Sequence, residues 1–427
     1  MKILRVCLLF LAFSLLITFC TARAEILMGW YTEVNNSEAW PGHAANGCNF
    51  FHLSGANWFR PAEVKAKLDI VQSLGGKASI DMKRTSGLPE LSLSEYTNFI
   101  NHVKTHPAVW GWYIADEPDL CPERRLSVET CRHRLAINPG WYRLTKSLDP
   151  ARYAWLVLAN KISPGWNDCA DIIALDTYPV YYGYTGFEAK ELRHQPDLMK
   201  SGLDYAEKFN KKPFIAVVQA FGGYGSWTEP NLSQMKYQVF SALVQGVKVI
   251  LWFHDGWASD SIKKIAAQVQ RITRDISPQM DMGIKNDSTV TLRQNLVAQN
   301  RLIFRYGLVG KIGALIAVNV ANRDNENGEV LANVQFTLPV GIRPSQVEVL
   351  GENRILSVTN GGFTDHFKPF EVHAYRFTTA TTPGPKTYGK MQTQSLTPQG
   401  RAAGQRGMFL EDRPQRDVPA GLAARSH

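Results

Sequence analysis

Eight short apolar runs, separated by amphipathic segments, dominate the first 280 residues of the chain. Each run is nearly continuous in apolar character, which is typical of strands that are covered on both faces. Strand and helix alternating eight times over about 250 residues predicts a (β/α)8 barrel, a fold of the α/β class. The runs span residues 25–31, 48–55, 77–83, 109–118, 153–160, 171–179, 213–221 and 248–257.

The segments between these runs have apolar residues at helical spacing. Ser92 and Glu95 have the spacing of a capping box at the start of the second helix, and Asp260 is the candidate cap of the last one. The predicted helices span residues 61–75, 93–106, 131–148, 201–212, 231–246 and 261–276. The alternative fold is a doubly wound open sheet. Nucleotide binding has little support, because no glycine-rich phosphate loop follows the first run.

The pattern changes after the last predicted helix. Residues 284–378 alternate apolar and polar side chains and carry turn signals such as Asn360-Gly361-Gly362. This predicts an antiparallel β-sandwich that follows a barrel domain at residues 25–280. Residues 379–427 are rich in Pro, Gly, Gln and Arg and lack periodicity, so we expect a disordered tail.

The N-terminus resembles a targeting segment rather than part of a fold. Residues 1–24 have a basic start, an apolar run from Cys7 to Cys20, and a small-residue Ala22-Arg23-Ala24 end. This predicts a cleaved signal peptide and a secreted or periplasmic protein, with an uncleaved membrane anchor as the alternative. No other stretch is long and apolar enough to predict a membrane span.

Four cysteines remain after the leader, and an even number in an exported protein favours disulfides. Cys121 and Cys131 flank a short polar segment and are the natural pair, which leaves Cys48 to pair with Cys169. Buried thiols are the alternative. Zinc has little support, because the chain has no C-x-x-C motif.

The charge distribution argues against nucleic acid as a partner. The formal net charge is +9, but the leader carries +3 and the tail +4, which leaves only +2 on residues 25–378. A nearly neutral body lacks the basic stripe that follows a phosphate backbone. The 11% aromatic content is instead typical of a protein that stacks rings on sugars.

The ends of the predicted strands collect acids, amides and aromatic rings. Barrel active sites lie at the C-terminal ends of the strands, so these side chains should meet on one rim. Carboxylates and amides bind sugar hydroxyl groups, and Trp30, Trp252 and Trp257 are candidate stacking platforms. The rim candidates are Trp30, Asp81, Asp116, Glu117, Asp176, Tyr178, Gln219, Trp252, His254, Asp255 and Trp257. The predicted ligand is therefore an oligo- or polysaccharide, with no cofactor and no metal.

The run Trp110-Gly111-Trp112-Tyr113-Ile114-Ala115-Asp116-Glu117-Pro118 resembles the strand-4 acid/base segment of the barrel glycoside hydrolases. Residues 246–253 are similar to their eighth strand, and many members carry a β-sandwich after the barrel. The resemblance implies that Glu117 is the general acid of a glycosidase. The neighbouring Asp116 supplies a like charge, which favours a protonated carboxyl group.

The chain departs from that family at the seventh strand. Retaining members place a nucleophilic Glu there, whereas this chain has Gln219. Three mechanisms remain open. A 2-acetamido group of the substrate attacks while Asp116 orients it and Tyr178 assists. Otherwise Asp176, Asp81 or Asp255 holds the water of an inverting reaction, or a loop carboxylate, Glu229 or Glu33, replaces the nucleophile.

Gln219 also motivates a rival from another class of protein, a non-catalytic carbohydrate-binding protein on a hydrolase-like scaffold. A structural surface protein that attaches through its sandwich is a third hypothesis.

Overall fold

The structure is a computed structural model that describes most of the chain between residues 26 and 379. The predicted leader, nearly all of the predicted tail, the pair Cys121 and Cys131, and the first part of the predicted helix 131–148 lie outside the described residues. The described ranges are 26–54, 60–82, 92–120, 139–159, 162–181, 183–211, 213–223, 225–292, 296–297 and 299–379.

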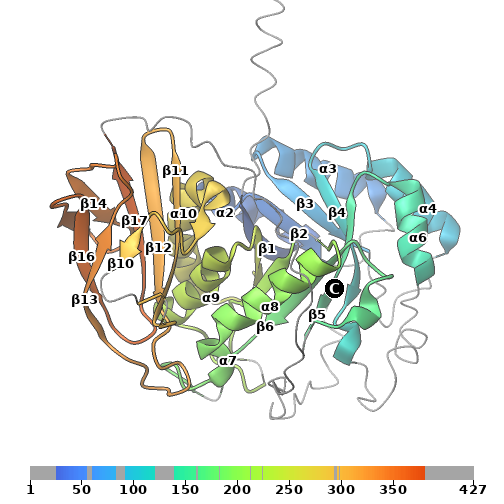
Figure 1. The fold of residues 1–427 in the computed structure, drawn as a ribbon. Coiled ribbons are helices and arrows are strands. Elements are labelled where there is room, and N and C mark those ends of the chain that lie inside the picture. Colours follow the sequence, from blue (N-terminus) through green and yellow to red (C-terminus); the bar gives the residue numbers. More distant parts are fainter. Residues whose placement is uncertain are drawn as a thin grey trace, which may run out of the picture.

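Eight parallel strands close into a barrel in sequence order, which confirms the predicted (β/α)8 architecture. The first and last strands complete the closure, with Leu27 opposite Val249 in a parallel register. Figure 1 shows the barrel in blue to green. The strands are β1 (Leu27–Glu33), β2 (Phe50–Ser54), β3 (Lys77–Asp81), β4 (Val109–Asp116), β5 (Tyr153–Leu158), β6 (Ile172–Thr177), β7 (Ile215–Gln219) and β8 (Val249–Phe253).

Helices and short 3-10 turns connect these strands. Ser92 and Glu95 form the predicted capping box at the start of α4. The cap of α10 is Ser259 rather than Asp260, and this helix extends beyond the predicted end at residue 276. The connecting elements are η1 (Val34–Ala39), α2 (Trp40–Ala45), α3 (Pro61–Ser73), α4 (Leu93–Val103), η3 (Pro118–Leu120), α6 (Pro139–Leu148), η4 (Pro164–Trp166), α7 (Lys190–Arg193), α8 (Gln195–Lys208), α9 (Leu232–Gln245) and α10 (Asp260–Met282).

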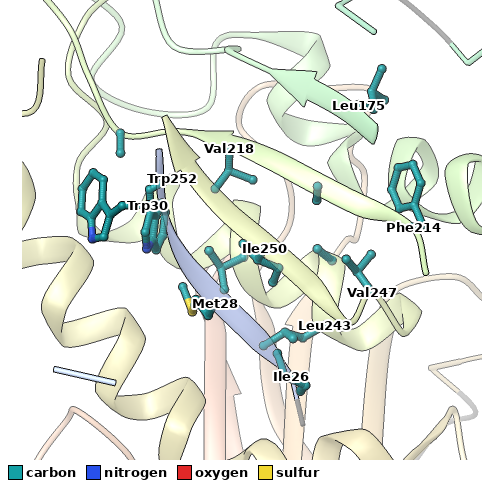
Figure 2. Packing of buried hydrophobic residues seen from close by; sticks show 14 of the residues in the cluster. Ile26, Met28, Trp30, Leu175, Phe214, Val218, Leu243, Val247, Ile250 and Trp252 are labelled. Carbon is teal, nitrogen blue, oxygen red and sulfur yellow. The ribbon is translucent and has the colours of Figure 1, made fainter. Parts of the chain in front are cut away.

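Alternate residues of each strand pack into two separate cores. Inward side chains such as Tyr31 and Leu251 fill the barrel, in a cluster formed by strand residues. Their neighbours Trp30 and Trp252 point outward and pack among residues of the surrounding helices. Figure 2 shows part of this outer layer around β1, β7 and β8. The alternation decides which strand-end residues reach the barrel mouth.

The predicted β-sandwich is present behind the barrel, and all its described strand pairs are antiparallel. One face of the six-stranded sheet packs on α9 and α10, and its other face packs on the three-stranded sheet (Figure 1, orange to red). The six-stranded sheet contains β15 (Arg354–Ser357), β14 (Gln346–Val349), β17 (Val372–Thr378), β12 (Ile312–Asn319), β11 (Leu302–Val309) and β9 (Ile284–Lys285). The three-stranded sheet contains β10 (Thr291–Leu292), β13 (Leu331–Thr337) and β16 (Gly362–Phe367).

The predicted disulfide between Cys48 and Cys169 is wrong. Both residues are buried thiols. Cys48 lies just before β2 and Cys169 just before β6, and these strands stand on opposite sides of the closed barrel. The barrel interior therefore separates the two sulfur atoms, whereas a disulfide needs Cα atoms within about 7 Å. Within the described ranges, no helix combines the length and apolar character that a bilayer crossing requires.

Candidate active site

An irregularity at the end of β4 aims Asp116 into the barrel. The register against β5 slips between Tyr113 and Ala115, which makes Ile114 the extra residue of a β-bulge. Tyr113 packs in the interior and Ala115 in the outer layer, so the bulge reverses the usual alternation and turns Asp116 inward. The Tyr113 hydroxyl donates a 2.5 Å hydrogen bond to Asp116 Oδ1. This contact favours the charged form of the carboxylate.

Glu117 follows in a strained backbone conformation. Its φ is +40°, in the left-handed region that side chains other than Asn and Gly rarely adopt. Among the described residues with a positive φ, only Glu117 and Phe370 are neither Gly nor Asn. Such strain costs roughly 1–3 kcal/mol and is concentrated at functional sites. The side chain of Glu117 is half-buried, whereas Asp116 is exposed.

Two further carboxylates lie deeper in the same mouth. Asp81 ends β3 and is 1% exposed, and Asp176 continues the inward series of β6 and is 2% exposed. Acidic residues from β3, β4 and β6 therefore converge at one end of the barrel. Asp116 and Glu117 are the members that solvent reaches, and Asp81 and Asp176 are the buried ones.

Two phenol groups reveal how close these carboxylates are. Burial raises the pKa of Tyr31 well above its usual value, and the charges of Asp116, Asp176 and Asp81 raise it further. Tyr31 itself lies in the barrel interior, where these negative charges act on its phenol. Tyr31 is therefore a neutral phenol surrounded by acidic groups.

Tyr178, which directly follows β6, is a second phenol whose pKa is raised well above its usual value. Burial is the first cause of its raised pKa, followed by the charges of Asp176 and Glu117, and the charge of Asp116 adds a smaller effect. Tyr178 thus stays protonated at any ordinary pH, and its hydroxyl can donate a hydrogen bond. The predicted residues Asp116, Glu117, Asp176 and Tyr178 lie at or just after the ends of β4 and β6.

Aromatic rings occupy the side of the mouth formed by β7 and β8. The Tyr178 ring lies 5.1 Å from Phe221, 5.5 Å from Phe253 and 6.2 Å from Trp227. Trp257 joins the group at 5.2 Å from Phe253. Every ring except that of Phe221 is partly exposed. The predicted position of Trp257 on the rim is consistent with this cluster, and the mouth has an acidic side and an aromatic side.

Gln219 lies at the end of β7, but its amide is bound to backbone groups. Nε2 lies within hydrogen-bond distance of the carbonyl oxygens of Val180, Phe221 and Thr228, at 2.9, 3.1 and 3.0 Å. Oε1 accepts a 2.8 Å hydrogen bond from the Val180 N–H. The side chain is fully buried. The expectation that Gln219 contacts substrate is therefore wrong, because its donors and its acceptor serve two loops.

Trp30 and Trp252 are also wrong as stacking platforms. They are 1% and 0% exposed and point away from the mouth, into the layer between the barrel and α10 (Figure 2). Both indole N–H groups lie 3.2 Å from the side-chain oxygen of Gln270, in the amide orientation that satisfies all three groups. Successive strand residues face opposite sides of the barrel wall. Trp30 and Trp252 therefore point outward, because their neighbours Tyr31 and Phe253 point inward.

Asp255 is a buried structural residue rather than part of the rim. Its Oδ2 accepts hydrogen bonds from the Thr32 hydroxyl at 2.8 Å and from Asn36 Nδ2 at 2.9 Å. His43 Nε2 lies 3.6 Å from the same oxygen. The carboxylate is fully buried, so it fastens β1 and η1 to the end of β8. Its partner Thr32 also binds Trp40 of the outer layer, so Asp255 faces that layer rather than the mouth, which removes it from the candidates for holding water.

His254, just after β8, contacts Ser54 at the end of β2, but the pair is not arranged as a nucleophile and its base. His254 Nδ1 accepts a 3.1 Å hydrogen bond from the Gly256 N–H, which places the proton of the neutral ring on Nε2. That nitrogen lies 3.3 Å from Ser54 Oγ. The Ser54 hydroxyl in turn donates to the Thr32 carbonyl at 3.1 Å. His254 is only 7% exposed, so it orders the loop rather than offering a binding group.

Sequence reasoning misses Tyr113, Phe221, Trp227 and Phe253. Strand alternation would have placed Phe253 inside, but nothing in the sequence shows the bulge that joins Tyr113 to Asp116. Of the loop carboxylates, Glu229 is half-buried just before α9, and the side chain of Glu33 lies outside what the structure describes. Across the described ranges, no group of three or more His, Cys, Asp or Glu side chains is arranged to hold a metal ion.

No protein-family model matches the chain, and no curated protein sequence matches it. Its structure is similar to those of several solved sugar-processing enzymes. The α-amylase of Geobacillus thermoleovorans in complex with acarbose has 10% identity and a TM-score of 0.48, over 84% of this chain and 99% of the other. For α-galactosidase I of Mortierella vinacea the values are 11%, 0.48, 85% and 99%.

A β-L-arabinopyranosidase from Geobacillus stearothermophilus is 10% identical, with a TM-score of 0.49 over 85% of this chain and 98% of that one. Similarity this remote does not carry an activity from one protein to another. The chemistry of this chain has to come from its own side chains.

Proposed function

We propose that this protein is a glycoside hydrolase in which Glu117 is the general acid and Asp116 its charged partner. The observation that carries the proposal is the mouth itself, where the ends of β3, β4 and β6 each carry a carboxyl group and Asp116 accepts a hydrogen bond from the buried Tyr113 phenol. Partly exposed rings face them. Glycosidic cleavage needs a proton donor at the departing oxygen and negative charge beside the oxocarbenium-like transition state. Aromatic rings stack on the apolar faces of sugars.

The surroundings of the two adjacent acids favour different protonation states. Asp116 accepts the Tyr113 hydroxyl, which stabilises its negative charge. Glu117 adjoins this charged carboxylate in the chain, and a like charge beside a carboxyl group favours its protonated form. One acid that holds a proton beside one that is charged is the pairing that this chemistry requires.

The site supports two routes for replacing the glycosidic bond at the anomeric carbon. In the first, Asp116 orients a 2-acetamido group of the substrate, which attacks the anomeric carbon as the glycosidic oxygen leaves with the proton of Glu117, and the Tyr178 hydroxyl donates a hydrogen bond. Water then opens the cyclic intermediate. In the second, Asp176 or Asp81 holds a water molecule and the reaction inverts. A nucleophile on β7 has no support, because the Gln219 amide is bound to loop backbone. The first route predicts retention at the anomeric carbon and the second predicts inversion.

The test is hydrolysis of a panel of aryl glycosides in which each sugar appears with a 2-hydroxyl and with a 2-acetamido group. We expect Glu117→Gln to reduce kcat by roughly 10²–10⁴-fold, the usual contribution of a positioned acid. Glu207→Gln makes the same change on the exposed surface of α8 and should hydrolyse like wild type. The anomeric configuration of the first product, followed by NMR, separates the two routes.

Full activity in Glu117→Gln would overturn the proposal. The rival function, carbohydrate binding without catalysis, predicts glycan binding with no release of sugar by wild type. It also predicts that Glu117→Gln leaves this binding unchanged.

A further inference from the structure

Two loops supply Tyr178, Phe221 and Trp227 to the aromatic side of the mouth, and one side-chain amide joins these loops. We infer that Gln219 is a positioning residue that holds the loop after β6 (the β6 loop, residues 178–189) against the loop after β7 (the β7 loop, residues 220–231). The inference deepens the proposed function, because these loops carry the rings on which a sugar would stack. It concerns the described residues of each loop, which exclude 182 and 224.

The amide of Gln219 is saturated by the two loops. From the β6 loop, Val180 supplies both its N–H to Oε1 and its carbonyl to Nε2. From the β7 loop, Nε2 meets the carbonyl oxygens of Phe221 and Thr228. The two N–H groups of the amide are therefore shared among three acceptors, at a site without solvent. An amide is the neutral side chain of this length that offers both donors and an acceptor.

Backbone contacts continue the junction outward from Gln219. The Thr228 N–H donates to the Val180 carbonyl at 3.1 Å, and the Gly183 N–H donates to Thr228 Oγ1 at 2.7 Å. Tyr181 and Trp227 form an antiparallel bridge. The two loops thus form a short ribbon, with Gln219 at the end nearest the barrel.

This ribbon determines where the rings stand. Tyr178 belongs to the β6 loop, whereas Phe221 and Trp227 belong to the β7 loop. The ring of Phe221 lies 5.1 Å from Tyr178 and 5.4 Å from Trp227, so the cluster exists only while the loops stay together. Tyr178 is also the phenol whose pKa is raised by burial and by the charges of Asp176 and Glu117. Displacement of the loops would separate the aromatic side from the acidic side.

Two more side-chain amides fasten the outer part of the β6 loop to the start of α9. Asn231 Nδ2 donates to the Thr185 carbonyl at 2.7 Å, and Gln234 Nε2 donates to the Gly186 carbonyl at 2.5 Å. These contacts do not involve the residues that Gln219 holds. The loop should therefore stay attached to α9 when Gln219 is changed, which confines the effect to the mouth.

A carboxyl group in place of the amide provides a pH-dependent test. When Gln219→Glu is ionised, negative oxygen atoms face three carbonyl oxygens, and the loops are pushed apart. When it is protonated, one oxygen still accepts from Val180 and the hydroxyl still donates to a carbonyl. Burial raises the pKa of such a carboxyl, so both states lie within reach. Loop closure in this variant should therefore improve as the pH falls.

The experiment is hydrogen exchange by mass spectrometry on the full chain at about pH 5 and about pH 8, corrected for intrinsic exchange. In Gln219→Glu we expect exchange in the β6 and β7 loops to rise about tenfold at the higher pH, as a lost hydrogen bond allows, and to return toward wild type at the lower pH. In a glycoside assay, KM should rise at the higher pH more than kcat falls. Gln270→Glu is the matched control, since it also introduces a buried acid but leaves both loops protected.

Three results would overturn the inference. The first is hydrogen exchange in the β6 and β7 loops of Gln219→Glu that stays at the wild-type level at the higher pH. The second is an equal increase of that exchange in Gln270→Glu. The third is a kcat of Gln219→Glu that increases with pH, as a newly acquired nucleophile would give. The exchange measurement does not depend on activity. A failure of the proposed glycosidase function therefore leaves the result for the loops intact.

Discussion

Asp116 owes both its direction and its charge to single residues. The extra residue Ile114 turns it inward, and the Tyr113 hydroxyl stabilises its negative form. We predict that Tyr113→Phe makes Asp116 easier to protonate, so that the acidic limb of the pH–activity profile moves to higher pH. The loss of a hydrogen bond to a charged group, about 1.5–3 kcal/mol, should lower kcat by roughly 10-fold or more near neutral pH. Tyr96→Phe, which removes a buried hydroxyl at 2.6 Å from Thr145, is the control and should leave the profile in place. An unchanged profile in Tyr113→Phe would contradict the role of this contact.

The sequence predicts which residues lie at the strand ends better than it predicts whether their side chains face the mouth or the outer layer. Asp116, Glu117, Asp176 and Tyr178 were placed together because they end barrel strands, and that rule depends only on the fold. Trp30 and Trp252 end strands as well, yet they point outward. The side that a strand residue faces depends on register and bulges, which arise from pairing with other strands. Periodicity within one segment does not contain that information.

At the scale of elements, the strands were easier to predict than the helices. The covered strands of the barrel are marked by continuous apolar runs, but the predicted helix 201–212 misses the first part of α8, which begins at Gln195 and contains Pro196. That proline occupies the first turn of the helix, where its missing N–H costs nothing. Pro278 lies inside α10 and did not end it, because α10 continues along the six-stranded sheet. Tertiary packing therefore extended an element that local propensity would have ended.

The packing of α10 on β11 requires a glycine at one point. A Cβ atom on Gly307 would lie 1.8 Å from the Gln279 carbonyl oxygen of α10. We predict that Gly307→Ala lowers the free energy of unfolding by about 3 kcal/mol or more, because two backbones would have to separate. Gly42→Ala in α2 adds the same methyl group where nothing lies within 4 Å, and it should be close to neutral. Calorimetric unfolding of both variants checks this, and equal melting temperatures would refute the close approach.

At the scale of the whole molecule, a charged network joins the barrel to the sandwich. Glu352 of the sandwich accepts from Lys236 of α9 at 3.1 Å, from His373 of β17 at 2.8 Å and from Arg354 of β15 at 2.8 Å. Arg354 also makes a bidentate contact with Asp365 at 3.0 Å. The sequence predicted the order of the two modules, but these residues gave no signal of a shared network. Only Lys236 belongs to the barrel, and its contact with Glu352 depends on the packing of α9 against the sandwich, which local sequence does not show.

This network should make stability depend on pH. Burial alone lowers the pKa of His373, but hydrogen bonds to the carboxylates of Glu352 and Glu371 outweigh burial and raise it from 6.5 to about 9. The folded protein therefore holds this proton more tightly than the unfolded chain does. The resulting stability is complete below pH 6.5 and is lost as the pH rises toward 9, by about 3 kcal/mol in total.

We predict that urea unfolding of the wild-type protein shows this decline between about pH 6 and about pH 9. In His373→Gln the free energy of unfolding should be lower at the acidic end of that range and nearly flat across it, because the neutral amide has no proton to lose. The variant would then approach wild type at the alkaline end. A decline of equal size in His373→Gln would assign the pH dependence to another group and remove His373 from the stabilising contacts between barrel and sandwich.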